Sequence, residues 1–351
     1  MIAWLAVIGW LAVIALLPAC ASGLDATAAG APVLAPTCED AVAAHTDVAG
    51  YPTIQGAIDD NEERAVIEVC PGLWAESLVI TRSVEVVGAE GHGSRIRGGM
   101  VITGASATLT GVWVTGGSAR PDLGDTRDCG GGIEVSDGEA HLFGVAITDN
   151  EAVRGGGLCA THAGVEVGAA SVILRNAADD GGGVYLDNSR IVLSADSEIN
   201  GNTATVSGGG IYALHSDIVG GLVVQNQAPD GGGIVLHSST LAASAITANF
   251  GSSGGGVYGG AFLVRGAELS GNTATLDGGG LYSYGGSIGV FDSTVQRNVA
   301  TRGGGGWMDA GTLASVESMW TDQWSDDIAA TDVSWVAGTR VSFTCTAVGC
   351  E

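Results

Sequence analysis

The chain has 351 residues, 59 of them Gly, and its 13 basic and 38 acidic residues give a formal net charge of −25. The basic residues are all Arg, with no Lys. This charge argues against nucleic acid and anionic membrane faces as partners, whereas cations and neutral or basic surfaces remain compatible. The length allows a substantial core, but the abundance of Gly makes long helices unfavourable.

The first 19 residues have the pattern of a secretory signal peptide. Ile2 to Leu17 is almost wholly apolar, shorter than the roughly 20 residues of a membrane-spanning helix. Leu17-Pro18-Ala19-Cys20 resembles a bacterial lipobox, which implies cleavage before Cys20 and lipidation of its thiol. Ala21 in place of Asp implies the outer membrane. Because no Arg or Lys precedes the apolar stretch, a cleaved secreted protein and an uncleaved anchor stay open.

The rest of the chain divides by composition. Residues 20–37 are rich in Ala, Gly and Pro, as expected of a flexible tether. We expect a β-helix with its N-terminal cap over residues 38–313. Residues 314–351 lose the repeat and gain Trp320, Trp324 and Trp335, which favours a C-terminal cap.

Removing Cys20 from seven cysteines leaves six, an even number that suits an oxidising compartment. Nearest-neighbour pairing, one of 15 connectivities, gives three disulfides: Cys38–Cys70, Cys129–Cys159 and Cys345–Cys350. Relative to the nearby glycine triplets, Cys129 and Cys159 are offset by five positions, which is about 17 Å along a strand. Their bond therefore requires the chain to bend back.

The first predicted elements are a short amphipathic helix at residues 51–58 and a strand at residues 66–69. The segment Gly72-x-Trp74-x-Glu76 follows. Together they are similar to the N-terminal cap of right-handed β-helix proteins of the pectin-lyase-like class, pectinesterases included. The resemblance implies that the helix covers the open edge of the first coil, as a solenoid requires.

A sequence motif recurs from residue 150 to residue 306. It consists of an aliphatic residue, two spacers, Asn, a few small residues and Gly-Gly-Gly. Its asparagines are Asn150, Asn176, Asn202, Asn226, Asn249, Asn272 and Asn298. The glycine triplets begin at Gly130, Gly155, Gly181, Gly208, Gly231, Gly254, Gly278 and Gly303. A period in the twenties marks a stacked solenoid. We predict an all-β fold, a single-stranded right-handed parallel β-helix of about 10 coils.

The strand period of two residues separates inward from outward columns. The first inward column is Ile133, Leu158, Val184, Ile211, Ile234, Val257 and Leu281, and the second is Ile147, Ile173, Ile199, Val223, Ile246, Leu269 and Val295. We expect the asparagines to adopt the left-handed conformation at a bend and to form a hydrogen-bonded ladder. The glycines should supply turn geometry and close approach between coils.

The repeat also carries a narrower resemblance. Asn202 with Gly209-Gly210-Ile211-Tyr212 looks like the repeat of the chlamydial polymorphic membrane proteins, and the similarity extends roughly over residues 130–307. It implies an adhesin-like surface role. Those proteins carry Phe where this chain has Ile, Leu or Val, and they end in an autotransporter barrel that this sequence does not show.

One outward column is rich in aromatic residues: Tyr185, Tyr212, Tyr258, Tyr282 and Trp307, with Val235 between the two groups. Aromatic rings with a polar edge are enriched at recognition surfaces, so we expect sugar rings or a surface protein to bind along this column. The structural alternative is a cross-strand stacking ladder that only stabilises the sheet.

Catalytic and metal signals are weaker. His92 lies in a segment that resembles a polygalacturonase signature, but Asp59 and Asp60 lie near the cap helix, and the acid cluster of that family is missing. The paired catalytic Asp residues of pectinesterases are also not found. The acids Asp180, Asp230 and Asp277 precede their triplets in alternate coils, roughly 10 Å apart, too wide for one Ca²⁺.

The insertion at residues 122–128 is the better cation loop, with Asp122, Asp125 and Asp128 as ligands and Ca²⁺ as the expected ion. A solvated acidic loop is the alternative. We expect no other cofactor.

The sequence thus favours a lipid-anchored protein of the cell outer membrane or cell surface, otherwise secreted. It would act as a non-catalytic binding, adhesin-like or envelope structural protein. A polysaccharide lyase or glycoside hydrolase is the alternative. Expected partners are carbohydrate or surface proteins and, through the lipid anchor, the membrane.

Overall fold

The computed structural model describes residues 51, 53–60, 64–89, 91, 93–119, 128–321, 324–325, 333–335 and 340–344. Several predictions fall outside these residues: the signal peptide, the tether, Cys20, Cys38, His92, Asp122, Asp125, Cys345 and Cys350. Within the described part, no helix is long and apolar enough to cross a membrane.

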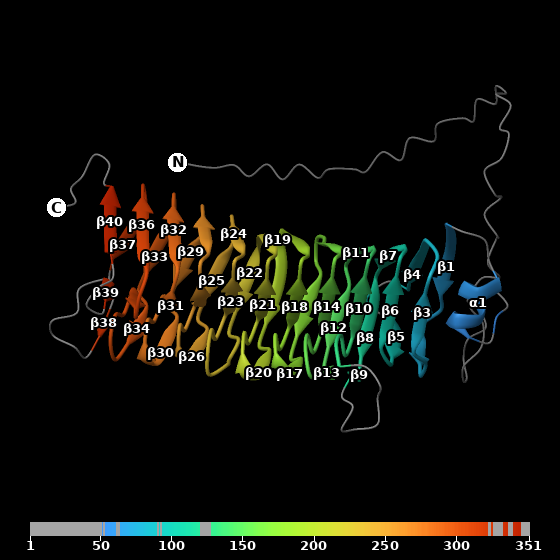
Figure 1. The fold of residues 1–351 in the computed structure, drawn as a ribbon. Helices are drawn as coiled ribbons and strands as arrows, with labels where there is room; N and C mark the ends of the chain where they lie inside the picture. Colours follow the sequence, from blue (N-terminus) through green and yellow to red (C-terminus); the bar gives the residue numbers. More distant parts are fainter. Residues whose placement is uncertain are drawn as a thin grey trace, which may run out of the picture. The chain divides into compact units, whose positions relative to one another are not determined.

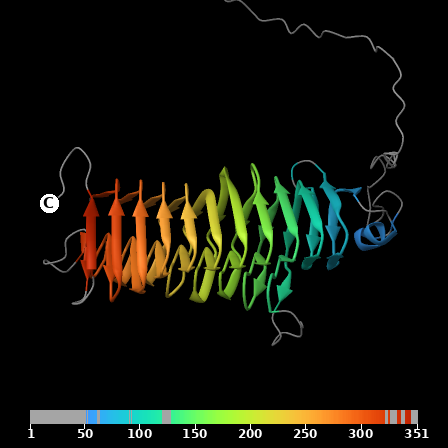
Figure 2. The same ribbon diagram turned by 45° about the horizontal axis from the view of Figure 1, so that its top comes forward.

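The described residues form a parallel β-helix preceded by one short helix, α1 (Ile54–Asp60). Each strand pairs in parallel with its counterparts in the coils before and after it (Figure 1 and Figure 2). One sheet contains 11 strands, one from each successive coil, in agreement with the expected number of about 10. The prediction of an all-β solenoid is confirmed.

Eight strands of that 11-stranded sheet directly follow a glycine triplet. Its strands are β3 (Leu78–Ile80), β6 (Met100–Thr103), β10 (Ile133–Ser136), β14 (Leu158–Thr161), β18 (Val184–Asp187), β21 (Ile211–Leu214), β23 (Ile234–His237), β27 (Val257–Gly260), β31 (Leu281–Gly285), β35 (Gly306–Met308) and β39 (Val333–Trp335). The register places the predicted inward residues opposite one another from coil to coil.

A 21-stranded sheet consists of two ladders, which two long strands, β19 (Arg190–Asn200) and β22 (Asp217–Val224), join. The first ladder also contains β1 (Ala65–Val69), β4 (Val84–Gly88), β7 (Ser106–Thr110), β11 (Glu139–Phe143), β15 (Gly164–Val167), β24 (Thr240–Ala242), β28 (Leu263–Arg265), β32 (Ser287–Phe291), β36 (Thr312–Val316) and β40 (Arg340–Thr344). The second also contains β2 (Gly72–Trp74), β5 (Ser94–Arg97), β8 (Val112–Thr115), β12 (Ala146–Thr148), β16 (Val172–Leu174), β25 (Ala245–Thr247), β29 (Glu268–Ser270), β33 (Thr294–Gln296) and β37 (Met319–Thr321). Parallel pairing therefore continues beyond residue 313, where the sequence repeat fades.

Two four-stranded sheets occupy the remaining side of the coils, between the asparagines and the triplets. One contains β9 (Ser118–Ala119), β13 (Glu151–Ala152), β17 (Ala177–Asp180) and β20 (Thr203–Ser207). The other contains β26 (Phe250–Ser253), β30 (Thr273–Asp277), β34 (Val299–Ala300) and β38 (Trp324–Ser325).

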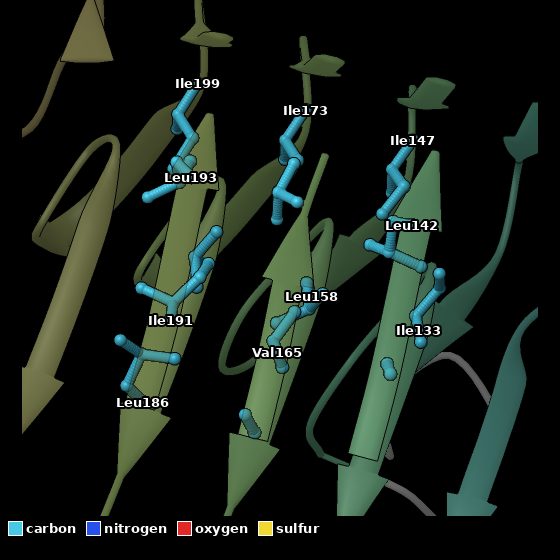
Figure 3. Close-up of a cluster of buried hydrophobic side chains, with 14 of the residues drawn as sticks. Ile133, Leu142, Ile147, Leu158, Val165, Ile173, Leu186, Ile191, Leu193 and Ile199 are labelled. Atoms are coloured by element: carbon cyan, nitrogen blue, oxygen red, sulfur yellow. The ribbon is translucent and has the colours of Figure 1, made fainter. Parts of the chain in front are cut away.

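Aliphatic side chains fill the interior of the helix. Every member of the two predicted inward columns is at most 1% exposed. Figure 3 shows three successive coils of this core, in which Ile147, Ile173 and Ile199 repeat from coil to coil. Burial of these side chains contributes about 1.5–3 kcal/mol each, so the core supplies the main stabilisation of the stack.

The asparagines form the predicted ladder. Nδ2 of each one donates to Oδ1 of the next, from Asn150 through Asn298, at 3.0–3.1 Å. Each Nδ2 also donates to a backbone carbonyl of the preceding coil, such as Ile173 O for Asn202 at 2.9 Å. The buried amides are thereby satisfied, as burial requires.

The expectation that Asn itself adopts the left-handed conformation is wrong. Positive φ occurs instead at the residue before each asparagine: Asp149, Arg175, Gly201, Gln225, Ala248, Gly271 and Arg297, with φ between 53° and 63°. The bend turns the next side chain inward, where the amide continues the ladder. The residue before each asparagine faces outward and adopts the positive φ.

Each glycine of a triplet has a different role. Gly181, the first, has φ of 65°, and a Cβ there would lie 2.3 Å from Val184 O. A Cβ on Gly182 would lie 2.4 Å from Thr203 O of the next coil, and one on Gly183 would lie 2.9 Å from Asn202 Nδ2. The predicted roles in turn geometry and close approach between coils are confirmed.

The disulfide between Cys129 and Cys159 is present, with their Cα atoms 5.6 Å apart. The chain does bend back, at Gly130, where a Cβ would lie 2.8 Å from Glu134 Cα. Glu134 pairs with Cys159 in register, so the bend brings Cys129 beside Cys159. Cys70 is also disulfide-bonded.

The short helix caps the first coil. Ile54, Ala57 and Ile58 are buried, and the Glu76 carboxylate accepts hydrogen bonds from the backbone N–H groups of Ile54 and Gln55 at 2.9 and 3.1 Å. These N–H groups have no partner within the helix, so Glu76 satisfies its N-terminus.

Candidate functional site

The residues that precede the triplets form a continuous column along the helix axis. Parallel bridges connect them from coil to coil in the order Cys129, Arg154, Asp180, Ser207, Asp230, Ser253, Asp277 and Arg302. The predicted alternation of acids is confirmed. Neutral serines separate the carboxylates, and arginines lie towards both ends.

The bend at each triplet places this column beside the outward aromatic column. The guanidinium carbon of Arg154 lies 5.3 Å from the centre of the Tyr185 ring, and that of Arg302 lies 4.3 Å from the Trp307 ring. The two columns therefore form one surface that carries both rings and charges.

The predicted aromatic residues stack in two pairs. Tyr185 and Tyr212 are parallel within 7°, with ring centres 5.1 Å apart, and Tyr258 and Tyr282 are parallel within 3° at 4.9 Å. Val235, which is buried, separates the pairs. Stacking in register is what the structural alternative predicts, so part of this column stabilises the sheet.

The column is less exposed than the alternation of strand residues suggests. Tyr185, Tyr282 and Trp307 are only 7–8% exposed, whereas Tyr212 and Tyr258 are half-buried. Arg154 lies over Tyr185 and Arg302 lies over Trp307. The more accessible rings of the column are therefore those in its middle.

Two residues that the sequence analysis missed complete this middle region. The His237 ring centre lies 5.2 Å from that of Tyr212, and the Tyr284 ring centre lies 5.9 Å from His237 and 5.6 Å from Tyr258. The Tyr284 hydroxyl lies 2.7 Å from His237 Nδ1. The rings thus form an unbroken path past Val235.

A β-bulge positions Tyr284. Ser283 pairs with Gly259 and Gly285 with Gly260, so Tyr284 has no partner in the ladder. Its ring lies against Gly260, where an added Cβ would come within 2.8 Å of the ring carbons. The bulge and the absent side chain at residue 260 together let the ring cross one coil. We call Tyr212, His237, Tyr258 and Tyr284 the tyrosine face.

The tyrosine face is neutral at ordinary pH, and burial disfavours the charged form of its side chains. Removal of water raises the pKa of Tyr212 to about 12 and that of Tyr258 to about 12. Nearby carboxylates add to the effect, Asp180 at Tyr212 and Asp230 at Tyr258. Burial lowers the pKa of His237, so its ring is neutral and its Nδ1 can accept a hydrogen bond from Tyr284.

Polar networks close both ends of the surface. Arg154 Nη2 donates to Asp128 Oδ2 at 2.7 Å. At the other end, Arg302 donates to both carboxylate oxygens of Asp277 at 2.5 and 2.7 Å. Asp309 accepts from Trp307 Nε1 at 2.8 Å and from the hydroxyl of Tyr282. The arginines at the ends therefore have their carboxylate partners already.

The predicted cation loop is only partly described. Of its three aspartates, Asp128 is described, and its carboxylate pairs with Arg154. Over the described ranges, no group of three or more His, Cys, Asp or Glu side chains is arranged to hold a metal ion. The calcium loop stays a prediction.

Comparison with known proteins gives one family match. Residues 196–214 match the Chlamydia polymorphic membrane protein repeat, as the residues around Asn202 and Tyr212 predict. No curated protein matches the chain. The match covers β20 and β21 with the bend between them.

Several solved structures are similar at low identity. A double mutant of the periplasmic alginate epimerase AlgG is 12% identical over 84% of this chain and 82% of that chain, with a TM-score of 0.48. The DFA-IIIase from Arthrobacter chlorophenolicus A6 is 14% identical over 82% and 86%, with a TM-score of 0.46. The Dettilon tailspike protein is 14% identical over 89% and 67%, with a TM-score of 0.44.

Proposed function

We propose that this chain is an exported, lipid-anchored protein of the outer membrane or cell surface that binds glycans through the tyrosine face without catalysing a reaction. The observation that carries the proposal is the unbroken aromatic path from Tyr212 through His237 and Tyr284 to Tyr258. It follows the helix axis over two coil steps, about 10 Å at the usual strand spacing.

The exposure of these rings supports a binding role. Tyr284 is 45% exposed, although its ring is held on two sides by His237 and Gly260. Rigid aromatic rings give contact area at little entropic cost, and their hydroxyl edges can hydrogen-bond to sugar hydroxyls. A ring with only a structural role would be expected to lie under its neighbours, as Tyr185 and Tyr282 do.

The family match supports the location. The matched repeat belongs to proteins that are called membrane proteins, and Tyr212 lies inside the match. Lipidation at Cys20 would attach such a protein to the membrane, leaving the coils free to display the tyrosine face.

A glycan array tests the proposal. We expect Tyr284→Ala and Tyr258→Ala each to weaken binding roughly tenfold, which corresponds to about 1.4 kcal/mol. Phe143→Ala is the matched control, because Phe143 is 38% exposed and lies on β11 in a different sheet. Equal binding by the unmodified protein and all three variants would rule out the tyrosine face as the site.

A polysaccharide-active enzyme is the second candidate. The observation that favours it is Asp230, whose pKa is raised by burial, as in a general acid. Asp180 lies two coils away in the same column, about 10 Å along the stack. This is near the roughly 6.5–9.5 Å between the carboxyl groups of inverting glycosidases. New reducing or unsaturated ends produced by the chain, and lost in Asp230→Asn, would establish it in place of simple binding.

A further inference from the structure

Four described carboxylates lie near the tyrosine face. The negative charges that act on its phenols belong to Asp180, Asp187, Asp230 and Asp309. The negative charge is concentrated near the rings, because Asp180 and Asp230 belong to the column beside them. Asp187 lies at the end of β18.

Within the described residues, none of these four carboxylates forms an ion pair. Asp180 accepts a hydrogen bond from Ser207 Oγ at 2.5 Å, and within the described residues it forms no ion pair. Asp230 forms neither an ion pair nor a side-chain hydrogen bond to any described residue, although it is partly buried. The nearest arginines of the column, Arg154 and Arg302, pair with other aspartates.

The other titratable groups that face this region are histidines and tyrosines. Burial lowers the pKa of His237 and so opposes a positive charge on its ring, and His215, in the turn after β21, acts on His237 in the same direction. The tyrosines stay protonated. Their ring faces carry negative quadrupole charge, which attracts cations. Rings and carboxylates therefore favour the same sign of ligand, and an anionic polymer would meet repulsion at both.

We propose that the glycan bound by the tyrosine face carries protonated amino groups, as in a polymer of amino sugars with free amines, and that polyuronates are excluded. This inference rests on the proposed function, since it assigns the chemistry of the ligand at the same site. An ammonium group above Tyr258 would lie near Asp230 and gain both interactions. The apolar faces of the sugar rings would lie on Tyr212 and Tyr284.

The test compares three oligosaccharides of equal length in calorimetry with the full-length protein at about pH 6. The probes are oligomers of glucosamine, N-acetylglucosamine and galacturonic acid. We expect the glucosamine oligomer to bind about tenfold more tightly than its acetylated counterpart at low salt. The ratio should shrink at 0.5 M NaCl, where the screening length falls to roughly 4 Å. The uronate should not bind.

Asp230→Asn tests the charge itself. We expect it to lower the preference for glucosamine over N-acetylglucosamine by about threefold, the effect of one partly screened charge. Asp292→Asn is the matched control, because Asp292 is an exposed aspartate in the turn after β32 on a different sheet, and its positive φ of 50° suits Asn. It should leave the preference unchanged.

The outcomes distinguish a failure of the charge inference from a failure of the proposed glycan binding. Equal affinity for the amine and the acetylated oligomer, both lost in Tyr284→Ala, would overturn the charge inference and leave glycan binding intact. Tighter binding of the uronate would overturn it as well. If no oligomer binds in a manner that depends on Tyr284 or Tyr258, the proposed function fails and the inference falls with it.

Discussion

The hydroxyl of Tyr284 lies 2.7 Å from Nδ1 of His237, a residue two coils earlier in the stack. A strand residue in a β-helix ordinarily contacts its counterparts one coil away. This contact crosses the coil between them, because Gly260 leaves room for the ring. It joins two stacked pairs of tyrosines into one surface.

The pH dependence of stability should report on His237. Burial lowers its pKa in the folded state below the usual 6.5. As the pH falls through about 6.5, the unfolded chain takes up the proton first, so the free energy of unfolding decreases until native His237 is protonated too. Urea denaturation at pH 7.5 and 5.5 measures this change. His237→Gln should show a smaller loss over the same interval, and an equal loss in both proteins would contradict the assignment.

Gly260→Ala should displace the Tyr284 ring without changing any side chain that contacts ligand. The new Cβ would lie 2.8 Å from the ring, and the ring can move away because it is partly exposed. We expect glycan affinity to fall roughly tenfold with little change in stability. The matched control is Gly164→Ala on β15, where the nearest atom to a new Cβ is 3.7 Å away. A variant at residue 260 that binds like the unmodified protein would show that the ring position is irrelevant.

The asparagine ladder should be the most sensitive part of the interior. Asn202→Ala removes the acceptor for Asn176 N and Nδ2 and the donor to Ile173 O and Asn226 Oδ1. We expect a loss of roughly 3 kcal/mol in the free energy of unfolding, because buried polar groups lose their partners. Urea denaturation followed by circular dichroism measures it. Thr203→Ala, at an exposed neighbouring position, should change it by less than about 0.5 kcal/mol.

The disulfide between Cys129 and Cys159 closes a loop of 30 residues in sequence. The joint replacement Cys129→Ser with Cys159→Ser should lower stability by about 3–4 kcal/mol, the entropy of a loop of that length. Denaturation under non-reducing conditions tests this while other disulfides stay intact. Unchanged stability would mean that the bond constrains the unfolded chain very little.

The sequence predicted the fold well because its signals are periodic. The aliphatic columns, the asparagines and the acids before the triplets recur at one spacing, and each appears in the structure as a column. Periodicity identifies which residues share a position in successive coils. It does not say which backbone residue turns: the pattern predicts positive φ at Asn150 and its counterparts, whereas the structure has it at the residues before them, such as Asp149.

The candidate site was predicted less completely because it depends on departures from the repeat. A bulge leaves Tyr284 without a partner in the ladder. In the sequence, His237, Gly260 and Tyr284 each stand six residues after the first glycine of their triplets. This shared offset and the missing side chain at Gly260 are a signal, but they do not show that the Tyr284 ring reaches across one coil to His237. Tyr185 is buried because it packs against Cys129 and Cys159 and lies under Arg154, which spacing alone does not reveal.

The asparagine ladder has a consequence for how such a protein changes its length. Successive asparagines are 23 to 26 residues apart in sequence, yet the Nδ2–Oδ1 distance stays at 3.0–3.1 Å. Each coil of the ladder therefore presents the same amide donor and acceptor to its neighbours, whatever the length of its outer loops. Duplication or deletion of a whole repeat in the gene would regenerate a complete junction, while a partial repeat would not. The number of coils, and with it the reach of the displayed surface, can then vary without redesign of the interior.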